Sequence, residues 1–240
     1  MGTRHLICIR INRQWVVAQY GQFDGYPTGQ GVRLFDFLHV EGNIARLRAG
    51  LPHIYKPTKE DIKKMNEAME AERARVAALG KEDLCSWLAA HTTDGDYLPF
   101  EPLRNSAAIE VWDERMLKDT FSRKINDQLM IMFPSLHRET SSKILELIAT
   151  ATADHQLPIL SELEFATDCM CEWVYVVDMD AEQLKVFRGM QYCYQGHPFE
   201  EVGGDSDLVP KLLATLTFAE LQSLDKAGLS KRAGEIECGE

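Results

Sequence analysis

The sequence predicts a single α+β domain over residues 1–226, in which hairpins near both ends of the chain share a mixed or antiparallel sheet and the middle is largely helical. Three observations lead to this prediction. β-branched and apolar residues gather in residues 5–20 and again in residues 172–188. Helical spacing of apolar residues dominates the stretch between them. The 240 residues are 45% apolar and 26% charged, a composition typical of a globular protein with one sizeable core.

The first predicted hairpin joins residues 5–12 to residues 14–20 through a turn near Asn12 and Arg13. The segment that follows, residues 21–31, contains four glycines and a proline. So many residues that interrupt regular structure predict a shaped loop.

Helices are predicted over residues 32–38, 43–51, 58–80, 84–90, 112–133 and 141–154. The third of these begins with Thr58-Lys-Glu-Asp61, a pattern typical of a helix N-terminal cap. Residues 172–178 and 183–188 predict the second hairpin. Short helices are expected over residues 208–216 and 218–224, and the polar residues 227–240 are expected to form a disordered tail.

The net charge of −11 argues against a protein that coats nucleic acid through bulk electrostatics. The charge is uneven, because residues 1–56 carry seven basic and three acidic residues, a local charge of +4 that leaves −15 for the remainder. A basic face beside an acidic body is therefore compatible with the sequence.

The sequence also gives expectations about location and metals. No apolar run reaches the roughly 18–20 residues that cross a bilayer, so we expect a cytoplasmic protein without membrane contact. The six cysteines and seven histidines show neither zinc nor redox spacing, and we expect reduced, mostly buried thiols. No metal or cofactor is therefore expected.

The segment from residue 19 to residue 31 is the strongest candidate for a site, because it combines glycines with aromatic, amide and acidic side chains. Its backbone can approach a ligand closely, while its side chains supply stacking and hydrogen bonds. Asp24 is a candidate base or cation ligand, and Tyr20 and Tyr26 are candidates for proton transfer. Gln19 and Gln22 are candidates for substrate binding. The alternative is a well-packed turn without a ligand.

Three further residues are candidates for substrate binding. Arg4 and His5 enter the first strand, from which they can approach the loop across the sheet, and the planar guanidinium of Arg4 suits phosphate or carboxylate recognition. Glu172 and Asp178 belong to the acidic second hairpin, where a carboxylate would suit a guanidinium or ammonium ligand. A solvated acidic surface is the alternative interpretation of that hairpin.

Three segments together resemble the arginine-containing cyclodipeptide synthases, a group of small, mostly fungal proteins. They are Met1-Gly-Thr-Arg-His-Leu6, then Ala18-Gln-Tyr-Gly-Gln-Phe-Asp-Gly-Tyr-Pro27 with Gly29-Gln-Gly31, and Glu172-Trp-Val-Tyr-Val-Val-Asp178. The resemblance implies an enzyme that joins arginine and a second amino acid from arginyl-tRNA and a second aminoacyl-tRNA into a diketopiperazine, without ATP or metal of its own.

Under this resemblance, Asp24, Glu172 and Asp178 would hold the arginyl guanidinium or amine. Tyr20 and Tyr26 would transfer protons, and the basic residues of the N-terminal region would meet tRNA phosphate. The residue that would carry a covalent aminoacyl group is not identified by the sequence.

Two other classes of protein remain open. One is a hydrolase or amidotransferase-like enzyme with an N-terminal nucleophile, which would require removal of Met1 and Gly2 to expose Thr3. The other is a non-enzymatic ligand-binding or protein-binding module.

Overall fold

The computed structural model describes residues 2–80, 83, 132–202 and 207–239. The chain divides into two compact units: Met1–Thr58 with Pro134–Glu240, and Lys59–Phe133. The sequence predicted one domain over residues 1–226, and the division falls within that range. In the second unit the structure describes helix α3 (Lys59–Ala77), as the cap pattern at Thr58 predicted.

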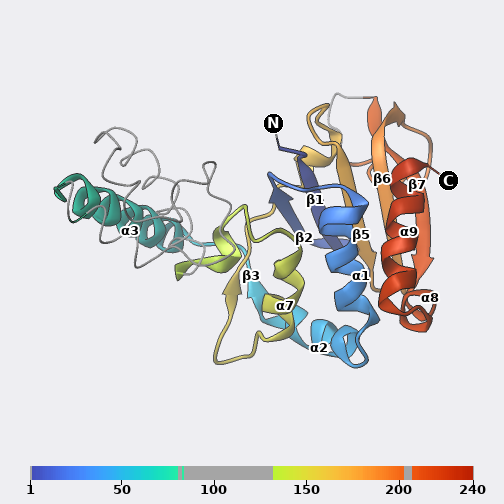
Figure 1. The fold of residues 1–240 in the computed structure, drawn as a ribbon. Helices are drawn as coiled ribbons and strands as arrows, with labels where there is room; N and C mark the ends of the chain where they lie inside the picture. Colours follow the sequence, from blue (N-terminus) through green and yellow to red (C-terminus); the bar gives the residue numbers. More distant parts are fainter. Residues whose placement is uncertain (1, 81–82, 84–131, 203–206, 240) are drawn as a thin grey trace, which may run out of the picture. The chain divides into compact units, whose positions relative to one another are not determined.

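A five-stranded sheet forms the centre of the first unit (Figure 1). Its order is β2-β1-β5-β6-β7, with β1 and β5 parallel and the other neighbours antiparallel. The strands are β1 (His5–Ile11), β2 (Gln14–Gly21), β5 (Trp173–Asp178), β6 (Gln183–Tyr192) and β7 (Leu208–Thr217). The predicted hairpins therefore share one mixed sheet, and the predicted α+β class is confirmed.

Helices cover one face of this sheet, and α1 and α9 lie across it in Figure 1. The helical elements of the unit are η1 (Pro27–Gly31), α1 (Val32–His39), α2 (Asn43–Gly50), η2 (Leu51–His53), η4 (Pro134–Leu136), η5 (Ser141–Lys143), α7 (Ile144–Ala149), η6 (Leu163–Thr167), α8 (Phe218–Ser223) and α9 (Lys226–Cys238). Short strands β3 (Ile54–Tyr55) and β4 (Leu157–Pro158) pair with each other.

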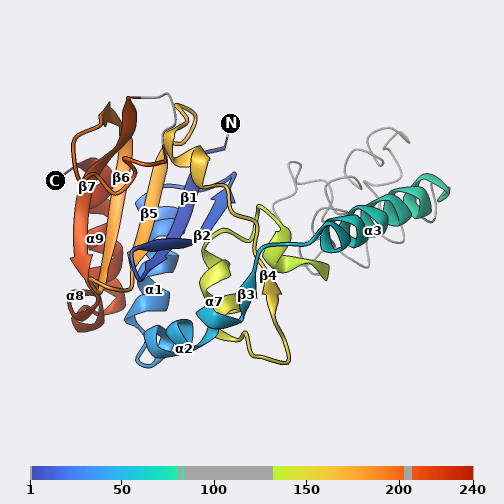
Figure 2. The same cartoon turned by 180° about the vertical axis from the view of Figure 1, so that it is seen from behind.

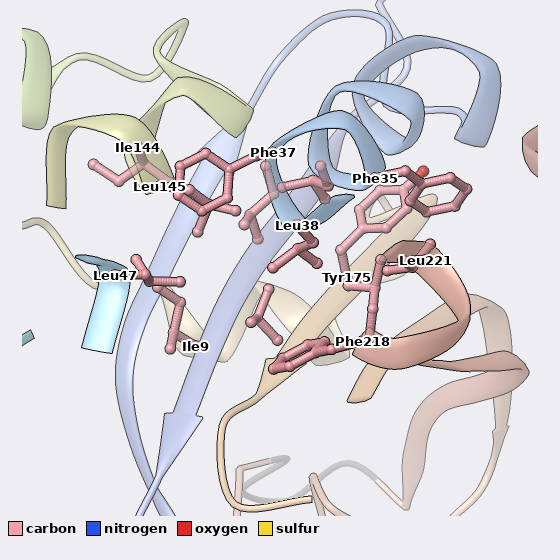
Figure 3. Packing of buried hydrophobic residues seen from close by; sticks show 14 of the residues in the cluster. Ile9, Phe35, Phe37, Leu38, Leu47, Ile144, Leu145, Tyr175, Phe218 and Leu221 are labelled. Carbon is pink, nitrogen blue, oxygen red and sulfur yellow. The ribbon is translucent and has the colours of Figure 1, made fainter. Parts of the chain in front are cut away.

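The main core lies between the sheet and these helices. Alternate side chains of a strand point to one face, so Ile9 of β1 and Tyr175 of β5 meet Phe35 and Leu38 of α1 there (Figure 3). Each fully buried side chain of this kind stabilises the fold by about 1.5–3 kcal/mol. The spacing of buried residues on α1 thus fixes which side of the helix faces the sheet.

The opposite face of the sheet, seen in Figure 2, carries a second apolar cluster. Leu6, Val174 and Phe187 point to this face and are buried together with Phe199 from the loop after β6. The segment η6 also packs here, with Phe165 edge-on against Tyr20. Both faces of the central strands are therefore buried, which explains their nearly continuous apolar sequence.

The turn of the first hairpin has the predicted position. Asn12 and Arg13 both have positive φ, at 52° and 64°, as a tight two-residue hairpin turn requires. Their backbone N–H groups donate to the Asp180 carboxylate at 2.9 Å each. Asp180 lies in the turn of the second hairpin, so the two hairpins are tied together at this end of the sheet.

The predicted helix over residues 208–216 is wrong, because β7 (Leu208–Thr217) is the edge strand beside β6. Apolar runs of this length fit a helix and a strand equally well by periodicity. Pro210 fits an edge strand, because the N–H that it lacks is not needed for pairing on the open side.

The predicted disordered tail over residues 227–240 is also wrong, since residues 226–238 form α9. The Asp225 carboxylate accepts the N–H of Gly228 at 2.7 Å and caps this helix. Leu229, Ala233 and Ile236 are buried against the main core, at the spacing of one helix face.

The remaining predicted helices divide into three groups. Those over residues 32–38, 43–51 and 218–224 are confirmed as α1, α2 and α8. The one over residues 141–154 is shorter than predicted, because the α-helical part α7 ends at Ala149. Residues 84–90 and nearly all of 112–133 lie outside the described residues.

Candidate functional site

The glycine-rich loop after β2 packs onto the beginning of β1. The N–H of Gly25 donates to the Thr3 carbonyl at 3.1 Å, and the buried Tyr175 hydroxyl donates to the Gly25 carbonyl at 2.7 Å. Burial raises the pKa of Tyr175 well above its usual value, and the Glu237 carboxylate adds to the rise. The hydroxyl therefore stays protonated and holds the loop against the sheet.

His5 lies fully buried beneath this loop, on the helix-covered face of the sheet. A Cβ atom on Gly21 would come within 2.2 Å of the His5 ring, and one on Gly25 would come within 2.8 Å. Glycine is required at both positions because the backbone lies directly on the imidazole. The glycines of the loop thus have a packing role that centres on His5.

The two ring nitrogens of His5 have different partners. Nε2 is hydrogen-bonded to the Ser141 Oγ, and Nδ1 lies 3.5 Å from the Thr3 carbonyl oxygen. A carbonyl only accepts, so we assign the ring hydrogen to Nδ1, which leaves Nε2 to accept the hydroxyl hydrogen of Ser141.

Burial lowers the pKa of His5 to about 4, against the opposing effects of the Thr3 carbonyl and the Asp24 carboxylate. The imidazole is therefore neutral at neutral pH. A neutral imidazole whose free nitrogen faces a hydroxyl is the arrangement that general-base catalysis needs.

Ser141 is held in an unusual backbone conformation at the beginning of η5, with φ of 49°. Its neighbour Ser142 has a different partner, because its hydroxyl donates to the Gln30 Oε1 at 2.6 Å. Thr140 donates its hydroxyl to the Pro134 carbonyl. All three side chains are buried. Ser141 and His5 form a polar cluster at the end of the sheet that carries the loop, whereas the hydroxyls of Thr140 and Ser142 are hydrogen-bonded to Pro134 and Gln30 and not to the imidazole.

The last turn of α9 also contacts the loop. Both the N–H and the hydroxyl of Thr28 donate to the Glu237 Oε2, at 3.1 and 2.6 Å. Arg188 of β6 donates to the Glu237 carbonyl at 3.0 Å. The C-terminal helix therefore fixes the end of the loop, where residues 27–31 form the helical turn η1 and not the irregular structure that the sequence predicted.

The three predicted catalytic residues lie around this cluster but outside it. Asp24 is exposed in a turn with φ of 56°, and its carboxylate acts on His5 through electrostatics. Tyr26 is half-buried and packs against the main core. Tyr20 points to the opposite face of the sheet, where its hydroxyl donates to the Gln22 Oε1 at 2.6 Å.

The predicted substrate-binding residues are divided between the two ends of the sheet. Arg4 follows Thr3, whose carbonyl accepts the N–H of Gly25 in the loop. Glu172 lies beside Arg4, since the N–H of Arg4 donates to the Glu172 Oε1 at 3.3 Å. Asp178 lies at the far end of β5, about 20 Å from Glu172 at the usual rise along a strand. The two carboxylates therefore cannot hold the same guanidinium.

Asp178 also has its own partners. Its carboxylate accepts from the Lys185 Nζ at 2.8 Å and lies 4.0 Å from the Arg10 guanidinium. Burial alone would raise the pKa of the Asp178 carboxyl. The hydrogen bonds from Lys185 and from the N–H of Ala181, together with the positive charges of Lys185 and Arg10, outweigh burial, so the pKa is lowered. Asp178 therefore forms a structural ion pair with Lys185.

Gln19 is buried beside the cluster. Its Nε2 donates to the carbonyls of Tyr20 and His137, at 3.2 Å each, and so joins β2 to the segment that leads to Ser141. Its Oε1 is buried without a hydrogen-bond partner within the described part of the chain.

A groove of about 1410 Å³ lies along the outer side of β2. Arg10, Arg13 and Trp15 line it near the hairpin turn, where the Arg10 guanidinium lies 5.6 Å above the Trp15 ring. Glu162 lines it further along, beside Ala18, whose carbonyl accepts the Glu162 N–H at 2.9 Å. Glu164 and Asp168 line the same groove.

Partial burial raises the pKa of Glu162 on the groove wall, and the charge of Arg138 opposes this rise. Arg138 is three residues before Ser141 in the chain, but neither Ser141 nor His5 lines the groove.

Sequence reasoning found the loop but missed the pair that it covers. His5 was predicted to enter the first strand near the loop, and Ser141 to begin a helical pattern, but neither side chain was named as a candidate for chemistry. In the described residues no group of three or more histidine, cysteine or acidic side chains is arranged to hold a metal ion, and no helix is long and apolar enough to cross a membrane. Of the five described cysteines, Cys8 and Cys171 are buried.

No family model, curated protein or solved structure matches this chain.

Proposed function

We propose that this protein transfers aminoacyl groups from tRNA and acts as an arginine-containing cyclodipeptide synthase, with arginyl-tRNA and a second aminoacyl-tRNA as substrates. One observation carries the proposal: the loop that bears the family-like sequence covers a hydroxyl, Ser141, that is hydrogen-bonded to a neutral imidazole, His5. Acyl transfer from an ester requires a nucleophile and a base that accepts its proton.

The chemistry of the substrates suits such a pair. The ester bond of an aminoacyl-tRNA is already activated, so the enzyme has to position two amines and two carbonyls and to move protons. The buried position of His5 and Ser141 removes water from the reacting groups, which limits hydrolysis of the ester.

The groove beside β2 supports the choice of substrate. Arg10 and Arg13 suit phosphate groups near the end of the tRNA, and the Trp15 ring, stacked on Phe199 and lying beneath Arg10, supports the Arg10 guanidinium. Glu162 and Glu164 suit the guanidinium of an arginyl group. The groove lining holds three cations, Arg10, Arg13 and Lys56, beside five carboxylates, Glu162, Glu164, Asp168, Glu200 and Glu201. Phosphate contact is therefore proposed only for the end of the groove near the hairpin turn, within a chain of net charge −11.

The proposal is tested with the purified full chain, total tRNA, arginyl-tRNA synthetase, ATP and isotope-labelled arginine, followed by mass spectrometry of the small molecules. We expect a labelled cyclic dipeptide that disappears when the synthetase is left out, because free arginine is not activated. Folded protein that yields no arginine-containing cyclic product from a full set of aminoacyl-tRNAs would overturn the proposal.

The same Ser141–His5 pair favours hydrolysis as the second candidate function, since an acyl group on a serine hydroxyl can also be transferred to water. The assay above separates the two functions. A hydrolase releases free labelled arginine from arginyl-tRNA, whereas a synthase releases it within a cyclic dipeptide.

A further inference from the structure

We infer that Ser141 is the nucleophile that becomes aminoacylated and that His5 is the base that accepts its proton. The inference rests on the proposed function for its acyl donor, an aminoacyl-tRNA. It adds what the sequence did not identify: a covalent intermediate and the residue that carries it.

Hydrogen bonding fixes the direction in which the proton moves. His5 Nδ1 faces the Thr3 carbonyl and Nε2 faces the Ser141 Oγ, so the nitrogen without a hydrogen is the one beside the hydroxyl. The contact of His5 with the backbone of Gly21 and Gly25 leaves the ring no room to rotate away. The imidazole is therefore oriented for Ser141 before any substrate arrives.

The backbone of Ser141 is the second, independent observation. Five non-glycine residues of the described chain have positive φ, and four of them, Asn12, Arg13, Asp24 and Glu182, lie exposed in turns. Ser141 is the buried one. Positive φ outside glycine is unfavourable and is found at functional sites where the surrounding structure enforces it. Here it directs the hydroxyl at the imidazole.

Aminoacyl transfer begins with the Ser141 hydroxyl. The Ser141 Oγ forms a bond to the carbonyl carbon of the aminoacyl ester, while His5 Nε2 takes the hydroxyl proton. The bond from that carbon to the ribose oxygen breaks, and the proton passes from His5 to this oxygen, which leaves as the tRNA hydroxyl. The amine of the second aminoacyl-tRNA then attacks the seryl ester and forms the peptide bond, and its proton passes through His5 to the Ser141 Oγ, which leaves as the free hydroxyl. The dipeptide is now esterified to the second tRNA. Its free amine attacks that ester and closes the ring, and the amine proton leaves with the ribose oxygen of the second tRNA.

Entry of the ester requires the loop to move. Ser141 is 3% exposed, and the loop segment that lies on His5 includes the exposed residues Phe23 and Asp24 between the two glycines. Beyond Gly25 the loop is held by the bonds from Thr28 to Glu237. The segment between Gly21 and Gly25 is therefore the part that opens.

Two variants and a matched control test the inference. Ser141→Ala removes the hydroxyl, and Ser141→Gly removes it while allowing positive φ without strain, so the fold is kept. Ser142→Ala is the control, since this neighbouring hydroxyl is buried but bonded to Gln30 and not to the imidazole. Each purified chain is mixed with arginyl-tRNA and quenched in acid, and the masses of the intact chain and of its proteolytic peptides are measured. Its rate of cyclic dipeptide formation is measured in parallel.

We expect the natural chain and Ser142→Ala to gain the mass of one arginyl group on the peptide that contains Ser141. Neither Ser141 variant should gain it, and their rates should fall on the order of a thousandfold. A well-folded Ser141→Gly chain that forms the product at the natural rate would overturn the inference and leave the proposed function standing. An arginylated Ser141 that releases only free arginine would support the nucleophile and remove the synthase function. Neither arginylation nor product in the natural chain would overturn both.

Discussion

Replacing His5 with glutamine tests whether the imidazole beneath the loop is buried in its neutral form. In an unfolded chain a histidine has a pKa near 6.5, whereas in the folded protein burial lowers the pKa of His5 to about 4. Between these two values the unfolded chain binds a proton at His5 and the folded chain does not. The folded protein should therefore be most stable above pH 6.5 and lose stability as the pH falls toward 4.

The size of the effect follows from the shift. One proton bound only by the unfolded chain changes the free energy of unfolding by about 1.4 kcal/mol per pH unit, or about 3 kcal/mol between pH 6.5 and pH 4. Below about pH 4 both states are protonated and the loss from this group is complete. The charged group that faces His5 within the described chain is Asp24, whose carboxylate opposes the lowering.

The assay is urea denaturation of the natural chain and of His5→Gln at several values of pH from 8 to 4. Other titrating groups are common to both proteins and cancel in the difference between their free energies of unfolding. We expect the natural chain to lose about 3 kcal/mol relative to His5→Gln across this range. His197→Gln is a comparison variant, because burial also lowers the pKa of this histidine beside Phe187 and Phe199, and the natural chain should lose stability relative to it in the same direction. Stability curves of the natural chain and His5→Gln that run parallel would refute the buried neutral imidazole.

Two further predictions concern the packing around the site. Gly50→Ala would place a Cβ 1.7 Å from the Ile148 carbonyl oxygen, so α2 and α7 must separate, and we expect a loss of about 2–3 kcal/mol in urea denaturation. Gly234→Ala, in α9 with open space around it, should instead stabilise the protein by up to about 1 kcal/mol, and equal effects of the two would contradict this reasoning. Glu237→Gln weakens two hydrogen bonds from Thr28, so hydrogen exchange at the Thr28 amide should accelerate while global stability falls by about 1 kcal/mol. Unchanged exchange would show that α9 does not hold the loop.

Much of the fold was predictable because its strongest signals are local. The strand around Ile7 and the strand around Tyr175 have the composition of buried strands, and Thr58 marks the beginning of a helix. Residues 208–216 were misassigned to a helix because Leu212 and Leu213 fit either element, and only pairing with β6 decides between them. The helix after Asp225 was missed because its buried face is short and set among polar residues.

The candidate site was predictable only in part. The loop from residue 21 to residue 31 was found because glycine and aromatic residues concentrate within it. Its partner Ser141 lies 136 residues from His5 in the chain, and their contact depends on how η5 packs against β1 and β2. Nothing in a single sequence records such a distant contact, and for that reason the exposed side chain of Asp24 was chosen over the buried pair.

The most direct test of the central claim, aminoacyl transfer through Ser141, is mass spectrometry of metabolites from a bacterial host that expresses the chain and supplies its own aminoacyl-tRNAs. Expression of the natural chain and of Ser142→Ala should each produce the same new arginine-containing cyclic dipeptide, and expression of a soluble, folded Ser141→Gly chain should not. The same product from all three chains would contradict the account.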